Sequence, residues 1–582
     1  MRLHRLFGQF CLIACAISSR AAIAAETPPP LQLVPADADF VVEIPNPRLL
    51  AETLLKHPNL KAARELEAAK ELLESTNLTR FLQLVSYYER DLGVTWPQLL
   101  DQLAGRGMVV AGKYANPDNT ALLIGGTDDE QMQRFLALVR KVIESEYSRQ
   151  ESKLVVEEST GNGVTILSLG GQASVIHFDR TLIITGKPVK LEEVEKFRAA
   201  SLARLVDSKK FKVSRNLKPK SPLAWAWFDL EDTKKSPEAQ AILATPRNDP
   251  ITTFLFAGLF DIYRRSPSLV VGLTEQNAQI KLGIKLPAGR EGLSPDTVLH
   301  LSHDSKTMNS QPLLTPPGTV FSHSFYLDLA AFWNDREKIF AEGIAKSITE
   351  ANKPFIPGLS NLTLSKILTS FGPHHRIVVA QVPRSTYATA KPNTELPDSA
   401  FVTTIPEASN RQAINAALRA GGLALSTVVK TRYTQEKIGE VTLVGYRFDE
   451  KTPLPDDEEN LRYNYSPCFA FVGDQLIVAS SLDLGRVLIA DLQNPKGKPS
   501  QKSNMQMGFY AEGIAKLVTR APESLITQAI LSRALTIEEA KKEVEQGIAW
   551  LNRLGKIGIT TEYLPKSFEL SFTWTPRTTP SK

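Results

Sequence analysis

Residues 121–186 share their order of features with a second passage that begins at Ala400. The first passage opens ALLIGGTDDEQMQRFLALVRKV and continues through GVTILSLG to DRTLIITG. The second opens AFVTTIPEASNRQAINAALRAG and continues through EVTLVGYRF to DQLIVAS. Each contains an apolar run, an amphipathic helical stretch and further apolar runs, in that order. This echo predicts a chain that is built twice from one design.

Shorter matches extend the echo beyond these passages. They occur in the same order in both halves, at offsets between 269 and 294 residues. The matched segments are Pro35–Phe40 with Pro316–Phe321, Asn77–Thr79 with Asn361–Thr363, Met108–Ala111 with Ile377–Ala380, Val164–Thr165 with Val441–Thr442, Leu182–Ile184 with Leu476–Val478, and Val271–Thr274 with Ile557–Thr560. Such an offset is far longer than a solenoid repeat, so the repeated unit is a whole domain. Two unrelated domains with similar patterning are the alternative.

Local patterning indicates the class of fold. Alternating apolar residues predict strands at 40–44, 164–169 and 173–178, with tight turns between some neighbours. Helical periodicity predicts a helix from Glu130 to about Glu144, capped by Asp128 or the residue before it. Hairpin-connected strands with interspersed helices are typical of an antiparallel sheet covered by helices, the α+β class.

The domain boundaries follow from the repeat and from a polar, proline-rich stretch near its middle. We predict two related lobes, each a mainly antiparallel sheet covered by helices. The predicted parts are a signal peptide at 1–25, a spacer at 26–33, a first lobe at 34–290, a linker at 291–314, a second lobe at 315–576 and a C-terminal tail at 577–582.

The N-terminus has the pattern of a secretory signal peptide. A basic start with Arg2 and Arg5 precedes a short apolar core at 6–17, and Ala22-Ile23-Ala24 is a small-x-small cleavage site. The segment Leu12-Ile13-Ala14-Cys15 also resembles a bacterial lipobox, so lipidation of Cys15 as an N-terminal anchor is the alternative to cleavage. Both interpretations predict export to the periplasm, the cell envelope or the medium.

Charge and hydropathy exclude two classes of partner. The whole chain has a net charge of +5. Loss of residues 1–25 removes three arginines and no acid, which leaves about +2, too little for electrostatic binding of nucleic acid. No later stretch approaches 18 uncharged apolar residues, so the mature chain is predicted to have no transmembrane span.

A few side chains invite a chemical interpretation. His374 and His375 are adjacent, and neighbours in a strand point to opposite faces, so they cannot chelate one metal ion from regular strand geometry. His323 is a further ligand only if the fold places it nearby. Cys468, the one cysteine outside the targeting segment, lies in an apolar run and is predicted to be a buried, inert thiol.

Other motifs are weaker still. Trp225 and Trp227 share a strand face and are predicted to pack in the core rather than to stack on a ligand. The acidic residues 456–459 lack the spaced carboxylates of a calcium loop. No nucleotide-binding glycine loop, nucleophile elbow or paired-cysteine zinc motif is present. We therefore assign no catalytic, cofactor-binding or metal-binding residue, and enzymatic activity stays uncertain, with none the preferred expectation.

The segment Val34–Val42, the exported N-terminus and the doubled strand–helix–hairpin plan resemble large secreted bacterial proteins of unknown function that are common among planctomycetes. The resemblance implies an exported, duplicated α+β protein. That family has no known catalytic residues, so the resemblance implies nothing about a reaction.

These observations favour an exported, non-catalytic binding or structural protein of the cell envelope, with an envelope protein or polymer as its partner. The alternative is an exported hydrolase or metal-dependent enzyme with its site between the lobes, at residues such as His323, His374 and His375. An envelope assembly or folding factor is a third hypothesis. The sequence does not identify the ligand or the oligomeric state.

Overall fold

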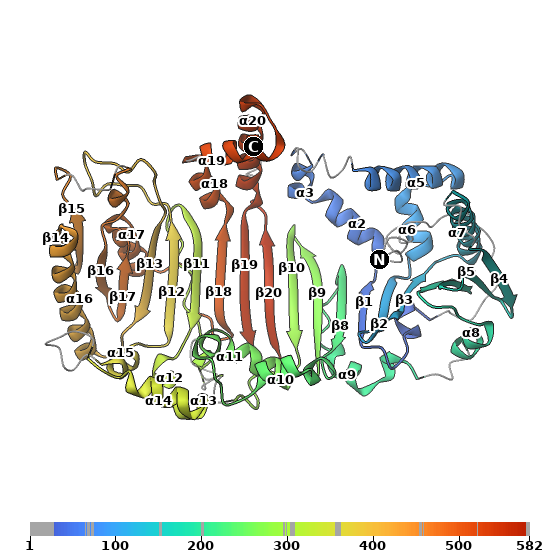
Figure 1. The fold of residues 1–582 in the computed structure, drawn as a ribbon, viewed down its shortest axis with the longest axis horizontal. Helices are drawn as coiled ribbons and strands as arrows, with labels where there is room; N and C mark the ends of the chain where they lie inside the picture. The colour runs from blue at the N-terminus through green and yellow to red at the C-terminus, as the bar shows by residue number, and fades with distance from the viewer. Residues whose placement is uncertain are drawn as a thin grey trace. The chain divides into compact units, whose positions relative to one another are not determined.

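A computed structural model gives the fold of the chain (Figure 1). It describes residues 28–577 apart from 65, 67–69, 71–74, 150–153, 199–202, 295–296, 298, 303–308, 355–362, 453–456, 458 and 521. The chain divides into two compact units. The first unit comprises the residues up to 233 together with 267–287, and the second comprises 234–266 and 288–582. Residues 234–266 thus belong to the second unit, although they precede the predicted linker.

The first unit contains an antiparallel sheet with the strand order β4-β5-β6-β7-β3-β2-β1-β8-β9-β10. The predicted strands β1, β5 and β6 have the expected bounds. The strands are β1 (Phe40–Ile44), β2 (Met108–Lys113), β3 (Asn116–Gly125), β4 (Val156–Gly161), β5 (Val164–Leu169), β6 (Ala173–Phe178), β7 (Thr181–Thr185), β8 (Ala224–Asp229), β9 (Ser268–Gln276) and β10 (Gln279–Leu286).

Helices cover both faces of this sheet. The helices of the first unit are α2 (Pro47–Lys56), α3 (Pro58–Ala63), α5 (Thr76–Leu92), α6 (Trp96–Ala104), α7 (Asp129–Arg149), α8 (Leu191–Arg198) and α9 (Lys209–Arg215). On one face, α6 and α7 bury residues such as Leu103 and Phe135 against Leu122 and Ile184. On the other face, α8 and α9 pack on the core that holds Trp227.

Helix α7 is longer than the sequence predicts. It begins at Asp129, where the Asp128 carboxylate accepts a hydrogen bond from the backbone N–H of Gln131 (3.3 Å), so the predicted cap is confirmed. The helix ends at Arg149, beyond the expected end near Glu144. Its last turns are polar, so apolar periodicity does not reveal them. Ion pairs within a turn, such as Arg149 with Glu146 (2.7 Å), join side chains of that stretch.

The second unit contains an antiparallel sheet with the corresponding strand order β14-β15-β16-β17-β13-β12-β11-β18-β19-β20. The fold class is thereby confirmed: two related lobes, each a mainly antiparallel sheet with helices packed on it. The strands are β11 (Thr319–Tyr326), β12 (His374–Ala380), β13 (Asp398–Thr404), β14 (Thr431–Ile438), β15 (Val441–Phe448), β16 (Cys468–Val472), β17 (Gln475–Ala479), β18 (Ser503–Tyr510), β19 (Lys556–Tyr563) and β20 (Phe568–Thr575).

The helices of the second unit leave one face of its sheet less covered. They are α10 (Pro237–Leu243), α11 (Pro250–Arg265), α12 (Leu329–Asn334), α13 (Arg336–Ile339), α14 (Glu342–Glu350), α15 (Leu364–Ser370), α16 (Ala408–Val429), α17 (Leu482–Gln493), α18 (Ala511–Arg520), α19 (Glu523–Arg533) and α20 (Ile537–Leu554). Helix α17 buries Leu484 and Leu488 against one face of the sheet. Helix α16 packs on the other face through Ile414 and Leu418, near β15 and β16.

Strand registers support the relation between the units residue by residue. Phe40 on β1 lies opposite Phe228 on β8, and Phe321 on β11 lies opposite Phe509 on β18. Both second-unit residues lie 281 positions after their first-unit counterparts (321 − 40 and 509 − 228). Equal offsets in two paired strands mean that both units use the same register.

Two of the sequence matches are displaced by two residues. Val110 pairs with Val42, and Ile377 pairs with His323, which lies 281 residues after Val42. Ile377 therefore corresponds to Val110, not to Met108 as the sequence match suggests. The same argument gives Val271 the counterpart Ile559 in place of Ile557. A shift of two residues keeps every side chain on its face, so apolar triplets match equally well in both alignments.

We expect Trp227→Ala to destabilise the first unit by about 3–5 kcal/mol, because it removes a 1 % exposed ring that contacts Phe211 at 5.4 Å in the core. Chemical denaturation followed by circular dichroism measures the change. Leu531→Ala on α19 is the matched control, since that side chain is 80 % exposed. An equal effect of both substitutions would contradict the core role of Trp227.

Candidate functional site

Strand β11 has an inverted burial pattern. Its serines, Ser322 and Ser324, are 0 % and 1 % exposed. The alternate residues Phe321, His323 and Phe325 point to the opposite face and remain partly exposed. A half-solvated antiparallel sheet normally turns its polar residues to water and its apolar residues inward. Strand β11 departs from this rule, because it turns its aromatic residues to the less covered face of the sheet.

Strand pairing extends this pattern across the sheet. Residues directly opposite one another in neighbouring antiparallel strands share a face. One row runs through β17, β13, β12, β11, β18, β19 and β20, and consists of Val478, Phe401, Ile377, His323, Met507, Ile559 and Phe572. The adjacent row contains Val379, Phe321, Phe509, Ile557 and Trp574. We call these two rows together the aromatic face.

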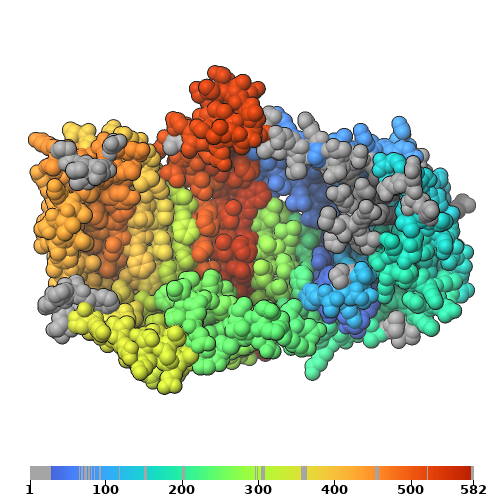
Figure 2. All heavy atoms as spheres, in the orientation of Figure 1, coloured from blue at the N-terminus to red at the C-terminus, as the bar shows by residue number. Residues whose placement is uncertain are grey.

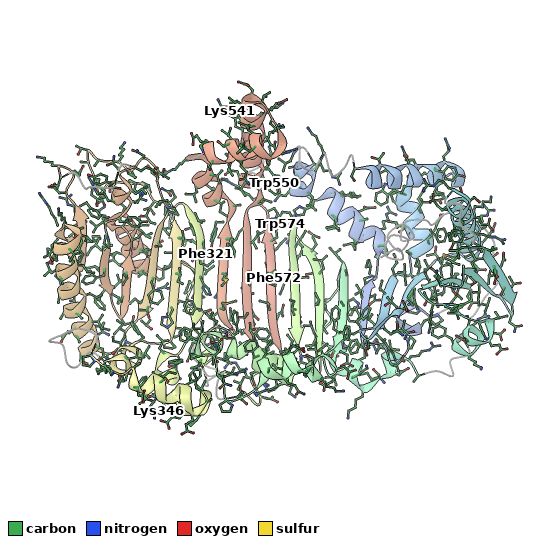
Figure 3. The ribbon with its side chains drawn as sticks, viewed as in Figure 1. Phe321, Lys346, Lys541, Trp550, Phe572 and Trp574 are labelled. Atoms are coloured by element: carbon green, nitrogen blue, oxygen red, sulfur yellow. The ribbon has the colours of Figure 1, made fainter. Side chains whose placement is uncertain are left out.

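Several members of the aromatic face are substantially exposed. Ile557 is 47 % exposed, Val478 40 %, and Phe401 and Phe509 38 % each. In Figure 1, helices α18–α20 lie beyond one end of strands β18–β20 and helix α11 lies at the other end. Figure 2 shows these strands deeper than the atoms of the flanking helices, and Figure 3 labels Phe572 and Trp574 on β20 and Phe321 on β11. The face is thus a broad strip of sheet rather than an enclosed pocket.

Ring contacts connect these strands and continue to a third row. Phe321 and Phe509 are 5.0 Å apart between centroids, and His323 stacks on Phe325 at 4.6 Å. Phe325 lies 5.3 Å from His375, which stacks on Phe401 at 5.6 Å. With the Phe321–His323 contact at 6.1 Å, these contacts form a chain of rings from β18 to β13. Planar rings in mutual contact present a rigid apolar surface to a partner.

Two positions of the aromatic face have buried counterparts in the first unit. Strand registers equate Phe401 with Leu122 and Val478 with Ile184, which are 1 % and 5 % exposed beneath α7. Helix α7 has several fully buried residues, whereas α16 has none. The second unit therefore keeps the sheet of the first but leaves these two positions exposed.

Two of the three histidines singled out in the sequence, His323 and His375, lie on the same side of the sheet as the aromatic face. His375 is 2 % exposed; its Nε2 lies 3.0 Å from the carbonyl oxygen of Leu327, and its Nδ1 lies 2.8 Å from Thr403 Oγ1. His374, on the other face of β12, contacts the ring of Tyr326. Among the residues that the structure describes, no three His, Cys, Asp or Glu side chains converge as a metal site. The described geometry therefore gives His323 and His375 a packing role.

Burial lowers the pKa of both imidazoles on this face. Desolvation lowers the pKa of His323 to about 4, and its Nε2 has no hydrogen-bond partner. Desolvation also lowers the pKa of His375 to about 4, with a smaller contribution of the same sign from His374. Both rings are therefore neutral at pH 7, and they pack against their neighbours as uncharged aromatic rings.

The remaining candidates have structural roles. Cys468 is 3 % exposed, and its thiol lies 3.2 Å from the carbonyl oxygen of Ser481. Burial raises the pKa of Cys468 to about 12, so the reactive thiolate does not form near neutrality. Trp225 and Trp227 both contact Phe211 in the core. Of the acidic stretch, Asp456 and Glu458 lie outside the described residues, and Asp457 forms an ion pair with Arg462 (3.2 Å).

Sequence reasoning missed the aromatic face. The alternation Phe321-Ser322-His323-Ser324-Phe325 is visible in the sequence. It predicts two faces of different polarity but not which face is buried. The usual assumption, apolar inward, gives the wrong answer for this strand.

We expect the free energy of unfolding to fall as the pH is lowered from 6.5 to 4. Unfolded imidazoles bind a proton near pH 6.5, whereas native His323 and His375 do so only near pH 4. The unfolded state therefore binds more protons in this window, and stability is lost with acidification. His323→Phe removes one such group, so the variant should lose on the order of 3 kcal/mol less than the wild type between pH 7 and pH 4. Denaturant titrations at a series of pH values measure the free energy of unfolding. An equal loss of stability between pH 7 and pH 4 in both proteins would contradict the lowered pKa of His323.

No helix among the described residues combines the length and the apolar character needed to cross a bilayer. No protein family matches the chain, and no curated protein is detectably similar in sequence. Among solved structures, TP0453 in crystal form I is similar at a TM-score of 0.24 and 11% identity, over 46% of this chain and 82% of that chain. TP0453 in crystal form III gives a TM-score of 0.25 and 11% identity, over 50% of this chain and 90% of that chain. Similarity at this level carries no functional argument.

Proposed function

We propose that the protein is an exported, non-catalytic binding protein of the cell envelope that holds an apolar partner against the aromatic face. The observation that supports this most is the unbroken row from Val478 to Phe572, which places apolar or aromatic side chains on every strand it crosses. Large exposed apolar patches on folded proteins mark interaction surfaces.

The energetics favour a partner over water at this surface. Each Å² of apolar surface removed from water contributes roughly 25 cal/mol. Side chains such as Phe509 (38 % exposed) and Ile557 (47 % exposed) still have much area to bury. An extended, open strip of sheet suits the broad surface of a protein or polymer better than a small molecule, which needs a concave site.

The compartment is part of the same proposal. The basic start, short apolar core and small-residue cleavage site at 1–25 support export. These residues lie outside the described part of the chain. Membership of the planctomycete-type group of secreted proteins and duplication of one ancestral lobe remain proposals, the second supported by the equal strand order and registers of the two units.

The hydrolase or metal-enzyme hypothesis receives no specific support. His375 is engaged by Leu327 and Thr403, and His323 stacks on Phe325. A binding role accounts for these rings as parts of an apolar surface. The contacts of these rings therefore favour the binding function.

Phe509→Lys combined with Ile557→Lys should abolish retention of the purified protein on a phenyl-substituted matrix, because two charges then interrupt the aromatic face. The matched control is Leu531→Lys with Val428→Lys, two even more exposed apolar residues on helices α19 and α16 (80 % and 76 % exposed). Chromatography in a descending salt gradient measures retention, and thermal melting verifies that both variants fold. Equal loss in the two double variants would refute a specific role for this face.

Photo-crosslinking identifies the partner class in the producing cell. A benzophenone amino acid placed at position 509 should give a discrete envelope adduct, whereas the same group at position 531 should not. Adducts of equal pattern and yield at both positions would overturn the proposed function.

We expect the mature N-terminus to lie after residue 25, because the small residues that precede Glu26 suit signal peptidase. Intact-mass spectrometry of the protein purified from its native envelope measures it. An intact mass that corresponds to a chain beginning at Glu26, without added lipid, would support ordinary cleavage. A diacylated chain that begins at Cys15 would show instead that the protein carries an N-terminal lipid anchor.

A further inference from the structure

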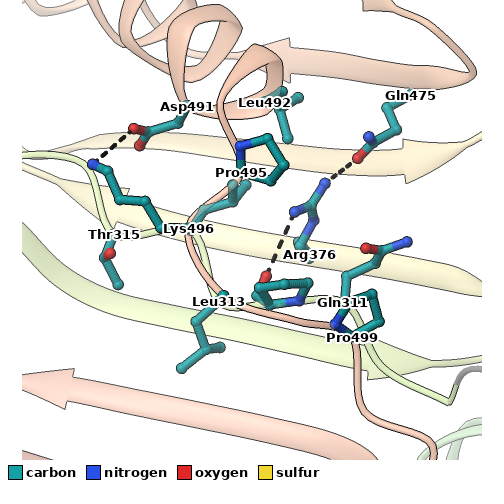
Figure 4. A pocket seen from close by; sticks show the side chains of 13 residues that line it. Gln311, Leu313, Thr315, Arg376, Gln475, Asp491, Leu492, Pro495, Lys496 and Pro499 are labelled. Carbon is teal, nitrogen blue, oxygen red and sulfur yellow. Dashed lines mark hydrogen bonds and ion pairs between the residues drawn. The ribbon is translucent and has the colours of Figure 1, made fainter.

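A small pocket lies in the second unit on the face of the sheet opposite the aromatic face (Figure 4). Its volume is about 170 Å³. The segment 311–315, strands β12 and β17, and the residues that follow α17 line it. A cavity of about 150 Å³ binds a molecule the size of benzene, so a pocket of this volume accommodates one small solute.

A buried cation forms part of the pocket wall. Arg376 on β12 is only 5 % exposed. Its guanidinium donates to Gln475 Oε1 and, at 3.5 Å, to the carbonyl oxygen of Pro312. Both acceptors are neutral. An arginine has five N–H donors, so these two bonds leave most of its hydrogen-bonding capacity unused.

The charge of Arg376 has no partner of opposite sign in the described structure. No carboxylate of a described residue lies within ion-pair distance of it, and Asp474 acts only through its longer-range field. Desolvation lowers the pKa of Arg376 to about 10, which leaves it charged at pH 7. Burying an unpaired charge costs several kcal/mol. The protein tolerates this cost at a position that faces a cavity.

The first unit indicates that the fold does not require this arginine. Arg376 pairs with Val402, and Val402 pairs with Ile477. The same registers in the first unit place Val109 at the position of Arg376. Val109 is 1 % exposed and belongs to the apolar core. A valine therefore packs at the corresponding position of a closely similar sheet, so the fold does not require a cation there.

A second cation stands at the rim of the pocket. Lys496 follows α17, and its Nζ lies 3.1 Å from Asp491 Oδ1. The lysine side chain is 71% exposed and that of the aspartate 15%. Figure 4 shows Lys496 and Arg376 on either side of Pro495. An exposed lysine can turn toward an entering anion at little cost, because exposed ion pairs contribute 1 kcal/mol or less.

We propose that this pocket binds a small oxyanion, a carboxylate or a phosphate, with Arg376 as its anchor and Lys496 as a second contact. The guanidinium fork matches either group through parallel N–H···O bonds. Leu313 and Leu492 line the same cavity and accommodate a short apolar tail. The site is independent of the aromatic face.

Isothermal titration calorimetry with acetate, butyrate and inorganic phosphate tests the proposal on the full mature chain. At least one of them should bind saturably with one site per chain. Butyrate above acetate identifies a carboxylate site with an apolar end. Phosphate above both carboxylates identifies a phosphate site. No saturable binding of any of the three up to 50 mM would overturn the proposal.

Variants separate the site from nonspecific charge effects. Arg376→Val, the residue of the first unit at this register, should fold and weaken binding at least tenfold. Lys496→Gln should weaken it severalfold, and Lys498→Gln is the matched control, since Lys498 is exposed two residues further on and does not line the pocket. If Arg376→Val fails to fold, the difference between the two lysine variants decides. Equal affinity in Lys496→Gln and Lys498→Gln, or unchanged affinity in a folded Arg376→Val, would refute the site.

Discussion

Antiparallel register is the constraint on which the rest of this structure depends. In a strand the side chains alternate between faces, so a slip of one residue would transfer every side chain of that strand to the other side. In the second unit the register places Phe321 beside Phe509 and buries Ser322 and Ser324. The aromatic face, the buried serines and the face of the sheet on which Arg376 lies all follow from the register of these strands.

The two units show how one sheet accommodates different surfaces. Their strand order and registers agree, yet Trp225 of the first unit corresponds to Gln506 of the second (506 − 225 = 281), and Val109 corresponds to Arg376. In the first unit such positions carry apolar side chains that close a core on the face beneath α8 and α9. In the second unit they carry polar groups that interact with the 309–315 segment, as where Gln506 donates to Ser310 at 2.8 Å. Backbone pairing is thus retained while the packing on each face diverges.

The sequence predicted the class of fold, the two related lobes and several strands. These features depend on the local alternation of apolar and polar residues and on an internal repeat that can be recognised in the sequence. The sequence alone could not align every strand, because alignments that differ by two residues match apolar residues equally well. Met108 and Val110 are therefore equally good sequence matches for Ile377. The sequence also could not assign the faces of β11. Whether Phe321 or Ser322 turns inward depends on what covers each face, and that is decided by segments outside the strand, such as 309–315.

The inverted strand bears on function because a chain selected for stability alone would bury the aromatic residues and expose the serines. Burying Ser322 and Ser324 withdraws two hydroxyl groups from water, and neither Oγ has a hydrogen-bond partner. Leaving Phe509 and Ile557 partly exposed forgoes apolar burial as well. Both penalties fall on neighbouring strands of one sheet, whereas the first unit buries the counterparts of Phe401 and Val478 under α7. A surface that costs stability on both of its sides, in a fold whose other copy buries two of the corresponding positions, supports the proposed binding partner.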